Sequence, residues 1–187
     1  HFVWMVFFSD GTPPAYMERI RSIQARFPAF RPVYLRDGEY MVGRFKQEVA
    51  AMLTPADTHV ITTRIDNDDA FHREMIARVR GEWHGQDDEI INFLNGLQCD
   101  LDAGVVALAK EQSNPFISRI ERVKPEGPRT VLEVMHFQAQ GSGALRDVDT
   151  SPLWLQLIHG GNVTNRLDSG RFLFHVDLAR DYGIARP

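Results

Sequence analysis

Three aspartates stand within four positions, at Asp66, Asp68 and Asp69, and Arg64 precedes them. Clustered carboxylates repel one another, so such a cluster costs stability unless water or a cation neutralises it. Hard oxygen ligands of this kind suit Mg²⁺ or Mn²⁺, which often bind through one or two carboxylates together with substrate phosphates. The cluster therefore predicts a metal–phosphate site. The same side chains would also serve as caps of a following helix, and the residues alone leave both interpretations open.

The position of this cluster is compatible with the functional interpretation and leaves the capping interpretation open. It follows the expected strand 59–65 and precedes an expected helix that places Phe71, Met75 and Val79 on one face. Open α/β sheets bind ligands at this kind of strand end. Two further Asp-x-Asp patterns, at 100–102 and 147–149, lie in an expected turn and an expected loop. An EF-hand calcium loop is disfavoured, because the alternating spacing and the glycine of that loop are missing.

The first 80 residues alternate between strand and helix patterns. The apolar run 2–8 predicts a strand buried on both faces, 31–35 predicts a second strand, and helices are expected over 13–27 and 41–52. Strand–helix alternation of this kind is typical of a parallel α/β sheet. A buried strand directly at a start without Met leads us to expect that the chain continues upstream.

The second half is expected to be largely antiparallel. The ranges 90–94, 97–101 and 105–110 predict a three-stranded meander, with Asn95-Gly96 as its first hairpin turn. Further strands are expected at 115–120, 130–137 and 171–176, a polar loop at 138–150, and a short helix at 152–158. We see no internal repeat and no linker, so one domain with an antiparallel extension is expected.

Composition excludes several classes of protein. The 187 residues are 43% apolar and 25% charged, as in soluble globular domains. A net charge of −4 argues against general nucleic-acid binding. A single cysteine, Cys99, permits no intrachain disulfide and favours a reducing, cytoplasmic location. No apolar run is long enough to span a bilayer, which leaves room for peripheral association with a membrane. Neither a Gly-x-Ser-x-Gly elbow nor a Gly-x-Gly-x-x-Gly loop is present, so a hydrolase of that type or a dinucleotide oxidoreductase is not supported.

Four segments carry a family resemblance. They are 62–70 with the acidic cluster, 2–13 with a Trp-containing strand and Asp-Gly-Thr-Pro, 114–121 with Asn-Pro-Phe-Ile-Ser-Arg-Ile-Glu, and 154–162 with Trp-Leu-Gln-Leu-Ile-His-Gly-Gly-Asn. Together they resemble the bacterial rhamnosyltransferase family within the GT-A glycosyltransferases. The segments occur in the family's order and cover most of the chain.

The resemblance implies a fold and an activity. The fold would be α/β, a GT-A-like, Rossmann-like mixed sheet with helices on both faces and an antiparallel C-terminal extension, whose first strand lies upstream of residue 1. One domain over 1–187 would bind nucleotide and metal in its half 1–82 and the acceptor in its half 83–187. The enzyme would use Mn²⁺ or Mg²⁺ to move a sugar, rhamnose by the family's name, from a nucleotide-sugar donor to a glycan or another hydroxyl acceptor, as in polysaccharide biosynthesis.

The resemblance also assigns roles to individual residues. Asp66 would contact the donor and the metal, and Asp68 and His159 would ligate the metal. Arg64 and Asn162 would bind the donor. Asp69 would be a further ligand or would accept a hydrogen bond beside one. Two simpler interpretations stay open: Arg64 would merely balance the carboxylates, and His159 would lie at the C-terminus of a helix ended by glycines.

Inversion at the sugar would require a carboxylate that takes the proton of the acceptor hydroxyl. We expect Asp149, ahead of Ser-Pro, to be this base, with Asp88 and Glu133 as rivals and helix capping as its structural alternative. His136 is expected in the core. Trp154 would lie in the core or stack on a sugar.

Two other functions stay open. A non-catalytic nucleotide-sugar-binding domain would keep the fold without turnover. A nucleotidyl or phosphate-transfer enzyme would use the same carboxylates, and its preference for a nucleoside triphosphate over an activated sugar would identify it.

Overall fold

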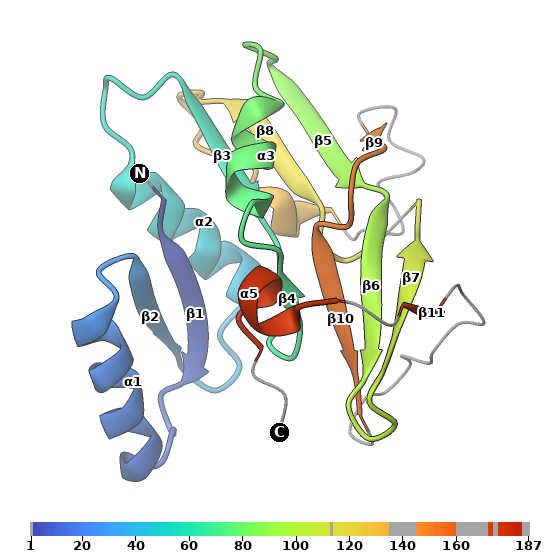
Figure 1. Ribbon diagram of the computed structural model, residues 1–187. Coiled ribbons are helices and arrows are strands. Elements are labelled where there is room, and N and C mark those ends of the chain that lie inside the picture. Colours follow the sequence, from blue (N-terminus) through green and yellow to red (C-terminus); the bar gives the residue numbers. More distant parts are fainter. Residues whose placement is uncertain (1, 113, 135–144, 160–171, 174–175, 185–187) are drawn as a thin grey trace. The chain divides into compact units, whose positions relative to one another are not determined.

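A computed structural model of the chain describes residues 2–112, 114–134, 145–159, 172–173 and 176–184 (Figure 1). The chain divides into two compact units, 1–48 and 49–187, with the boundary inside helix α2. The described helices include none that is both long and apolar enough to cross a membrane.

The first unit is a parallel strand–helix–strand motif. Strands β1 (Trp4–Ser9) and β2 (Phe30–Leu35) pair in parallel from Trp4 opposite Phe30 to Ser9 opposite Leu35, and α1 (Pro14–Arg26) connects them. Helix α2 (Met41–Met52) follows. The expected strands and both helices of this region are therefore confirmed.

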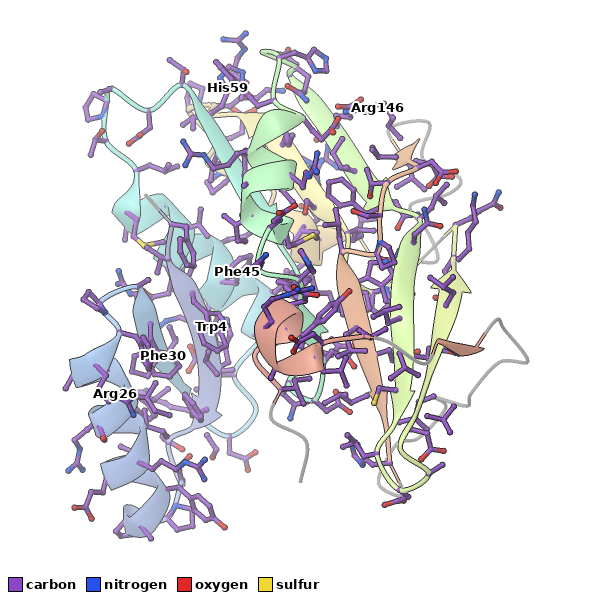
Figure 2. All side chains as sticks on the ribbon, in the orientation of Figure 1. Trp4, Arg26, Phe30, Phe45, His59 and Arg146 are labelled. Carbon is purple, nitrogen blue, oxygen red and sulfur yellow. The ribbon has the colours of Figure 1, made fainter. Side chains whose placement is uncertain are left out.

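Aromatic side chains pack this first unit. The rings of Trp4 and Phe30 meet edge to face, with centroids 5.6 Å apart (Figure 2). Phe7 meets Phe45 of α2 in the same way, with centroids 6.1 Å apart. Trp4 is nevertheless half exposed, and no side chain of β1 is fully buried. The expectation that this strand is buried on both faces is wrong, because among the described residues β2 is its only neighbour in the sheet.

The second unit contains two sheets. One has the strand order β3-β8-β5-β9 and the other β11-β7-β6-β10-β4. The bounds are β3 (His59–Thr63), β4 (Ala70–Phe71), β5 (Asp88–Phe93), β6 (Asn95–Asp100), β7 (Val105–Lys110), β8 (Ser118–Arg122), β9 (Leu145–Val148), β10 (Trp154–Ile158) and β11 (Phe172–Leu173). Helices α3 (Met75–Gly81) and α5 (Leu178–Tyr182) and a 3₁₀ turn, η1 (Val131–Glu133), complete it.

The fold is thus mixed α/β, but the expected single mixed sheet is wrong for the described residues. The strand at 59–63 does not extend the parallel β1–β2 pair; it pairs antiparallel with β8, His59 opposite Arg122 and Thr63 opposite Ser118. A run of β-forming residues indicates a strand without specifying its partner, because pairing is decided by packing elsewhere in the chain.

The expected hairpin at Asn95-Gly96 is also wrong. Strands β5 and β6 belong to different sheets, and these two residues begin β6. Gly96 is needed for packing rather than for a turn, because a Cβ at this position would lie 2.0 Å from the ring of Trp154. The second hairpin, β6 to β7, is confirmed, with Asp100 opposite Val105.

The range 152–158 forms a strand, not the expected helix. In β10, Leu155 joins one hydrophobic cluster with Leu97 and Cys99, whereas Trp154 joins another with Phe93 and Phe116. Because both faces are buried, the apolar run carries no two-residue alternation, and a short run of this kind fits either structure. Three other expected strands are also revised: 115–120 becomes β8 at 118–122, 171–176 becomes β11 at 172–173, and the described part of 130–137 contains η1.

The two clusters lie on opposite faces of the β6–β10 sheet. The first core cluster joins α3 and the β5–β8 sheet to Trp154, and the second joins α5 to Leu97, Leu155 and Val106. Figure 1 shows α5 beside β4 and β10. This packing fixes the position of β10, and His159 follows directly after this strand.

Candidate active site

The acidic turn, Asp66–Asp69, connects β3 to β4. The amide of Asp69 donates to the carbonyl oxygen of Asp66 at 3.3 Å, which closes the turn. The amide of Arg64 donates to the carbonyl oxygen of Ile117 at 3.1 Å, so the chain stays attached to the segment before β8 as it enters the turn. The predicted location at a strand end is confirmed.

The interpretation of this cluster as a helix cap is wrong. Two residues of strand, β4, follow the turn directly, and α3 begins only at Met75. The residue in the N-cap position of α3 is Glu74, whose side chain makes no capping hydrogen bond. The carboxylates of the acidic turn therefore do not cap the N-terminus of α3.

Arg64 pairs with the first carboxylate of the turn. Its Nη2 donates to Asp66 Oδ1 at 2.9 Å, and its Nε reaches the same oxygen at 3.2 Å. Both side chains are partly exposed. This contact fits the interpretation that Arg64 balances the charge of the cluster. It also holds the Asp66 carboxylate beside the positively charged guanidinium group of Arg64.

His159 meets the second carboxylate. Its Nε2 lies 3.5 Å from Asp68 Oδ2, with roughly a third of each side chain exposed. His159 directly follows β10, so its interpretation as the end residue of a helix is wrong. The structure thus brings together two of the three predicted metal ligands from segments far apart in the sequence.

Asp69 is the most buried carboxylate of the turn. Its Oδ1 accepts a hydrogen bond from the Leu157 amide of β10 at 3.1 Å. Burial raises the pKa of Asp69 to about 7; the Leu157 hydrogen bond opposes this rise, and the charges of Asp68 and Asp66 add to it. The sequence offered no signal for this contact, because 152–158 was expected to be a helix, whose amides would bond within the helix.

The described residues offer the predicted Mg²⁺ or Mn²⁺ two adjacent side chains, Asp68 and His159. Within the described part of the chain, no three His, Cys, Asp or Glu side chains are gathered closely enough to hold a metal ion. Asp68 and His159 are adjacent, whereas Asp66 is paired with Arg64. Asp68 supplies the kind of oxygen ligand that Mg²⁺ or Mn²⁺ takes together with phosphate and water, whereas the imidazole of His159 is a nitrogen ligand, which transition-metal ions accept more readily than Mg²⁺.

Asp149 lies at the other end of the β6–β10 pair. Its Oδ1 accepts from Asn95, the first residue of β6, and its Oδ2 lies 2.8 Å from Lys110 Nζ. Ile158, next to His159, is opposite Asp100 at the last residue of β6. Five strand residues span roughly 17 Å, so the structure does not bring Asp149 to the acidic turn.

The contacts of Asp149 keep its carboxylate ionised. Hydrogen bonds from Lys110 and from Asn95 lower its pKa, and the Lys110 charge adds to the effect. The segment after it forms β10, so its alternative interpretation as a helix cap is wrong. Its role as a base stays a prediction.

The rival carboxylates Asp88 and Glu133 contact the same buried arginine. Arg119 is 2% exposed and donates from Nε to Asp88 Oδ1 at 2.7 Å and from Nη2 to Oδ2 at 2.6 Å. Its Nη1 lies 3.5 Å from Glu133. These contacts join β5, β8 and η1 through the Arg119 side chain. The geometry therefore gives Asp88 and Glu133 a structural role.

Trp154 is a core residue. Its side chain is fully buried, stacks on Phe116 with centroids 5.0 Å apart, and donates from Nε1 to the carbonyl oxygen of Phe93 at 2.8 Å. The sugar-stacking interpretation is therefore wrong. His136 and Asn162 lie outside the described residues.

Comparison with known proteins gives one match. No curated protein and no solved structure matches the chain. The family model described as "Putative rhamnosyl transferase" matches residues 1–171, which include the acidic turn, β10 and His159. The chain therefore belongs to this rhamnosyl transferase family.

Proposed function

We propose that the protein is a metal-dependent glycosyltransferase, which moves a sugar from a nucleotide-sugar donor to a glycan or another hydroxyl acceptor. Membership of the family supports glycosyl transfer, and its name suggests rhamnose as the sugar. The observation that carries the proposal is the 3.5 Å approach of His159 Nε2, directly after β10, to Asp68 Oδ2 of the acidic turn.

Asp68 and His159 would hold Mn²⁺ or Mg²⁺, with the diphosphate of the donor supplying further ligands. When bound, such a cation neutralises charge on the departing nucleoside diphosphate. Arg64 keeps Asp66 in a fixed orientation through two hydrogen bonds to one oxygen. In this arrangement Asp66 would face the donor, while Asp69 anchors the turn to β10 through the Leu157 amide.

The first experiment measures the ligand-linked stability of the protein. Mn²⁺ together with a nucleoside diphosphate should raise the melting temperature more than either ligand alone. A ligand at about 100 times its dissociation constant adds roughly 2.7 kcal/mol. Asp68→Asn should abolish the metal-linked rise. It should change the ligand-free stability little, because half-exposed ion pairs contribute about 0–1 kcal/mol.

Asp102→Asn is the matched control, because Asp102 belongs to another Asp-x-Asp pattern, in the exposed turn between β6 and β7. This variant should keep the full rise. Turnover is then screened with nucleotide sugars that differ in base and sugar, by release of the nucleoside diphosphate. Full metal-dependent turnover in Asp68→Asn would refute the assignment.

The same screen decides between the alternatives. Binding of a nucleotide sugar without any release of diphosphate would indicate a non-catalytic binding domain. A preference for a nucleoside triphosphate would indicate nucleotidyl or phosphate transfer. Release from one activated sugar in the presence of an acceptor would identify the donor.

A further inference from the structure

The strand that follows the acidic turn is too short to hold its own position. Strand β4 has two residues and pairs with β10 at two positions, Trp154 opposite Phe71 and Leu155 opposite Ala70. It is also the edge of its sheet. So few ladder hydrogen bonds open readily, and local opening is governed by the contacts around such a segment.

Helix α5 supplies contacts to the residues that leave β4. The amide of Arg73 donates to the carbonyl oxygen of Asp181 at 2.8 Å. The imidazole of His72 meets the ring of Tyr182 edge to face, with centroids 5.3 Å apart. The carboxylate of Asp181 lies 3.9 Å from His72 Nε2 and 3.8 Å from Arg73 Nε. The helix therefore fixes the C-terminal side of β4.

The same helix also contacts the residues that enter β10. Tyr182 donates its hydroxyl to the carbonyl oxygen of Pro152 at 3.2 Å. The carbonyl oxygen of the next residue, Leu153, accepts a hydrogen bond from the amide of His72 at 2.9 Å, which joins the segment after β4 directly to the segment before β10. Tyr182 thus contacts the residue that follows β4 and a residue just before β10.

Helix α5 is itself well anchored. Leu178 and Tyr182 pack with Leu97, Cys99 and Leu155, and the partly buried Ala70 and Leu157 lie against this cluster. The Asp177 side chain accepts the Arg180 amide at 3.0 Å at the start of the helix, and Gly183 ends it in the left-handed conformation with φ 71°. A short helix with both ends capped can transmit support from the core to the strand edge.

We infer that α5 is a clamp that holds the acidic turn against β10, with Tyr182 as its principal positioning residue. Its grip on β4 and β10 sets the distance between Asp68 and His159. As far as it concerns cation affinity, this inference rests on the proposed function.

The test compares amide hydrogen exchange in two variants without ligand. Tyr182→Phe removes the hydroxyl that bonds Pro152 and keeps the ring. Asp177→Ala removes the cap of α5 without touching either strand. Each should speed exchange in the segment 66–73 about fivefold, the factor that corresponds to a hydrogen bond worth roughly 1 kcal/mol. Exchange in β5 and β8 should not change.

Matched controls remove the same groups elsewhere. Tyr40→Phe removes an exposed tyrosine hydroxyl, and Asp57→Ala removes an aspartate that accepts the Thr54 amide in a surface turn. Neither should alter exchange in 66–73. Unchanged exchange there in Tyr182→Phe, or an equal rise throughout residues 49–187, would overturn the clamp.

A second readout connects the clamp to the site. Dissociation of Mn²⁺ in the presence of nucleoside diphosphate is measured from the electron paramagnetic resonance of the free ion. Tyr182→Phe and Asp177→Ala should weaken binding about fivefold, whereas the controls should bind as the unaltered protein does. Faster exchange with unchanged Mn²⁺ affinity would overturn the link between α5 and the Asp68–His159 distance. Failure of the unaltered protein to bind Mn²⁺ would count against the proposed function, while the exchange data would still decide the clamp.

Discussion

Replacement of Asp88 by asparagine tests whether this residue supports the fold or takes part in the reaction. Asp88 makes paired hydrogen bonds to Arg119, which is 2% exposed, and its Oδ2 lies 2.8 Å from Nη1 of the half-exposed Arg129. Breaking a buried pair typically costs about 3–5 kcal/mol, because a buried charge loses its partner. Asp88→Asn keeps one acceptor oxygen, and Glu133 remains 3.5 Å from Arg119. We therefore expect a smaller loss of stability, about 2–3 kcal/mol, because Arg119 keeps part of its compensation.

The pH dependence of this loss has a definite sign. Burial raises the pKa of Asp88, but hydrogen bonds from Arg119 and the charges of Arg119 and Arg129 outweigh it, so the pKa lies below its ordinary value. A lowered pKa in the folded state gives stability that is present above the unfolded pKa and is lost as the pH falls through the folded pKa. The difference between Asp88→Asn and the unaltered protein should therefore be full at pH 7 and shrink below about pH 4.

Urea unfolding, followed by tryptophan fluorescence at several pH values, measures both effects. Asp87→Asn is the matched control, because Asp87 is the neighbouring residue and its ion pair with Arg122 is exposed. Asp87→Asn should lower the free energy of unfolding by less than about 1 kcal/mol. A loss below about 1 kcal/mol in Asp88→Asn, or a difference that widens in acid, would refute the reasoning. If folded Asp88→Asn has lost turnover, a catalytic role for Asp88 would replace the structural one.

Three further predictions concern the frame around the site. Gly96→Ala should lower the free energy of unfolding, measured in urea, by at least about 3 kcal/mol, because the added methyl group overpacks the Trp154 ring and disrupts its hydrogen bond to Phe93. Unchanged stability would show that the Trp154 ring can move. Thr130→Gly should stabilise the fold by about 1 kcal/mol, since Thr130 has a φ of 66° and a buried hydroxyl without a partner among the described residues; a loss above 1 kcal/mol would contradict this. Cys99, which is 3% exposed, should react with thiol reagents only after unfolding, and rapid reaction of the folded protein would show that its cluster opens.

The place of the acidic turn could be predicted from the sequence because it depends on local features. A β-forming run at 59–63 and the polar residues after it mark the end of a strand whatever its partner is. That Asp68 and His159 lie close together could be predicted only from the family resemblance, which makes both of them metal ligands. No local pattern joins two residues whose contact depends on the register of β10 against β4 and β6.

The errors at β10 and at Asn95-Gly96 have one physical origin. Trp154 lies flat against Gly96, so the glycine accommodates a ring rather than a turn, and the tryptophan needs the buried carbonyl oxygen of Phe93. The first fact depends on the register of β10 against β6, and the second on the contact between two sheets. An Asn-Gly pair and an apolar run of seven residues look the same in sequence whether or not such a contact exists.

The three carboxylates of the acidic turn are each stabilised in a different way. Asp66 is paired with Arg64 two residues away. Burial raises the pKa of Asp69 to about 7, so near neutral pH this carboxyl is partly protonated and repels its neighbours less. Asp68 faces His159, which directly follows β10. A cation that entered between Asp68 and His159 would leave the Arg64–Asp66 pair and the Asp69–Leu157 hydrogen bond in place. The turn can therefore keep its shape with and without a ligand. Under the proposed function, its affinity for a cation would depend on how firmly β4 and β10 are held together.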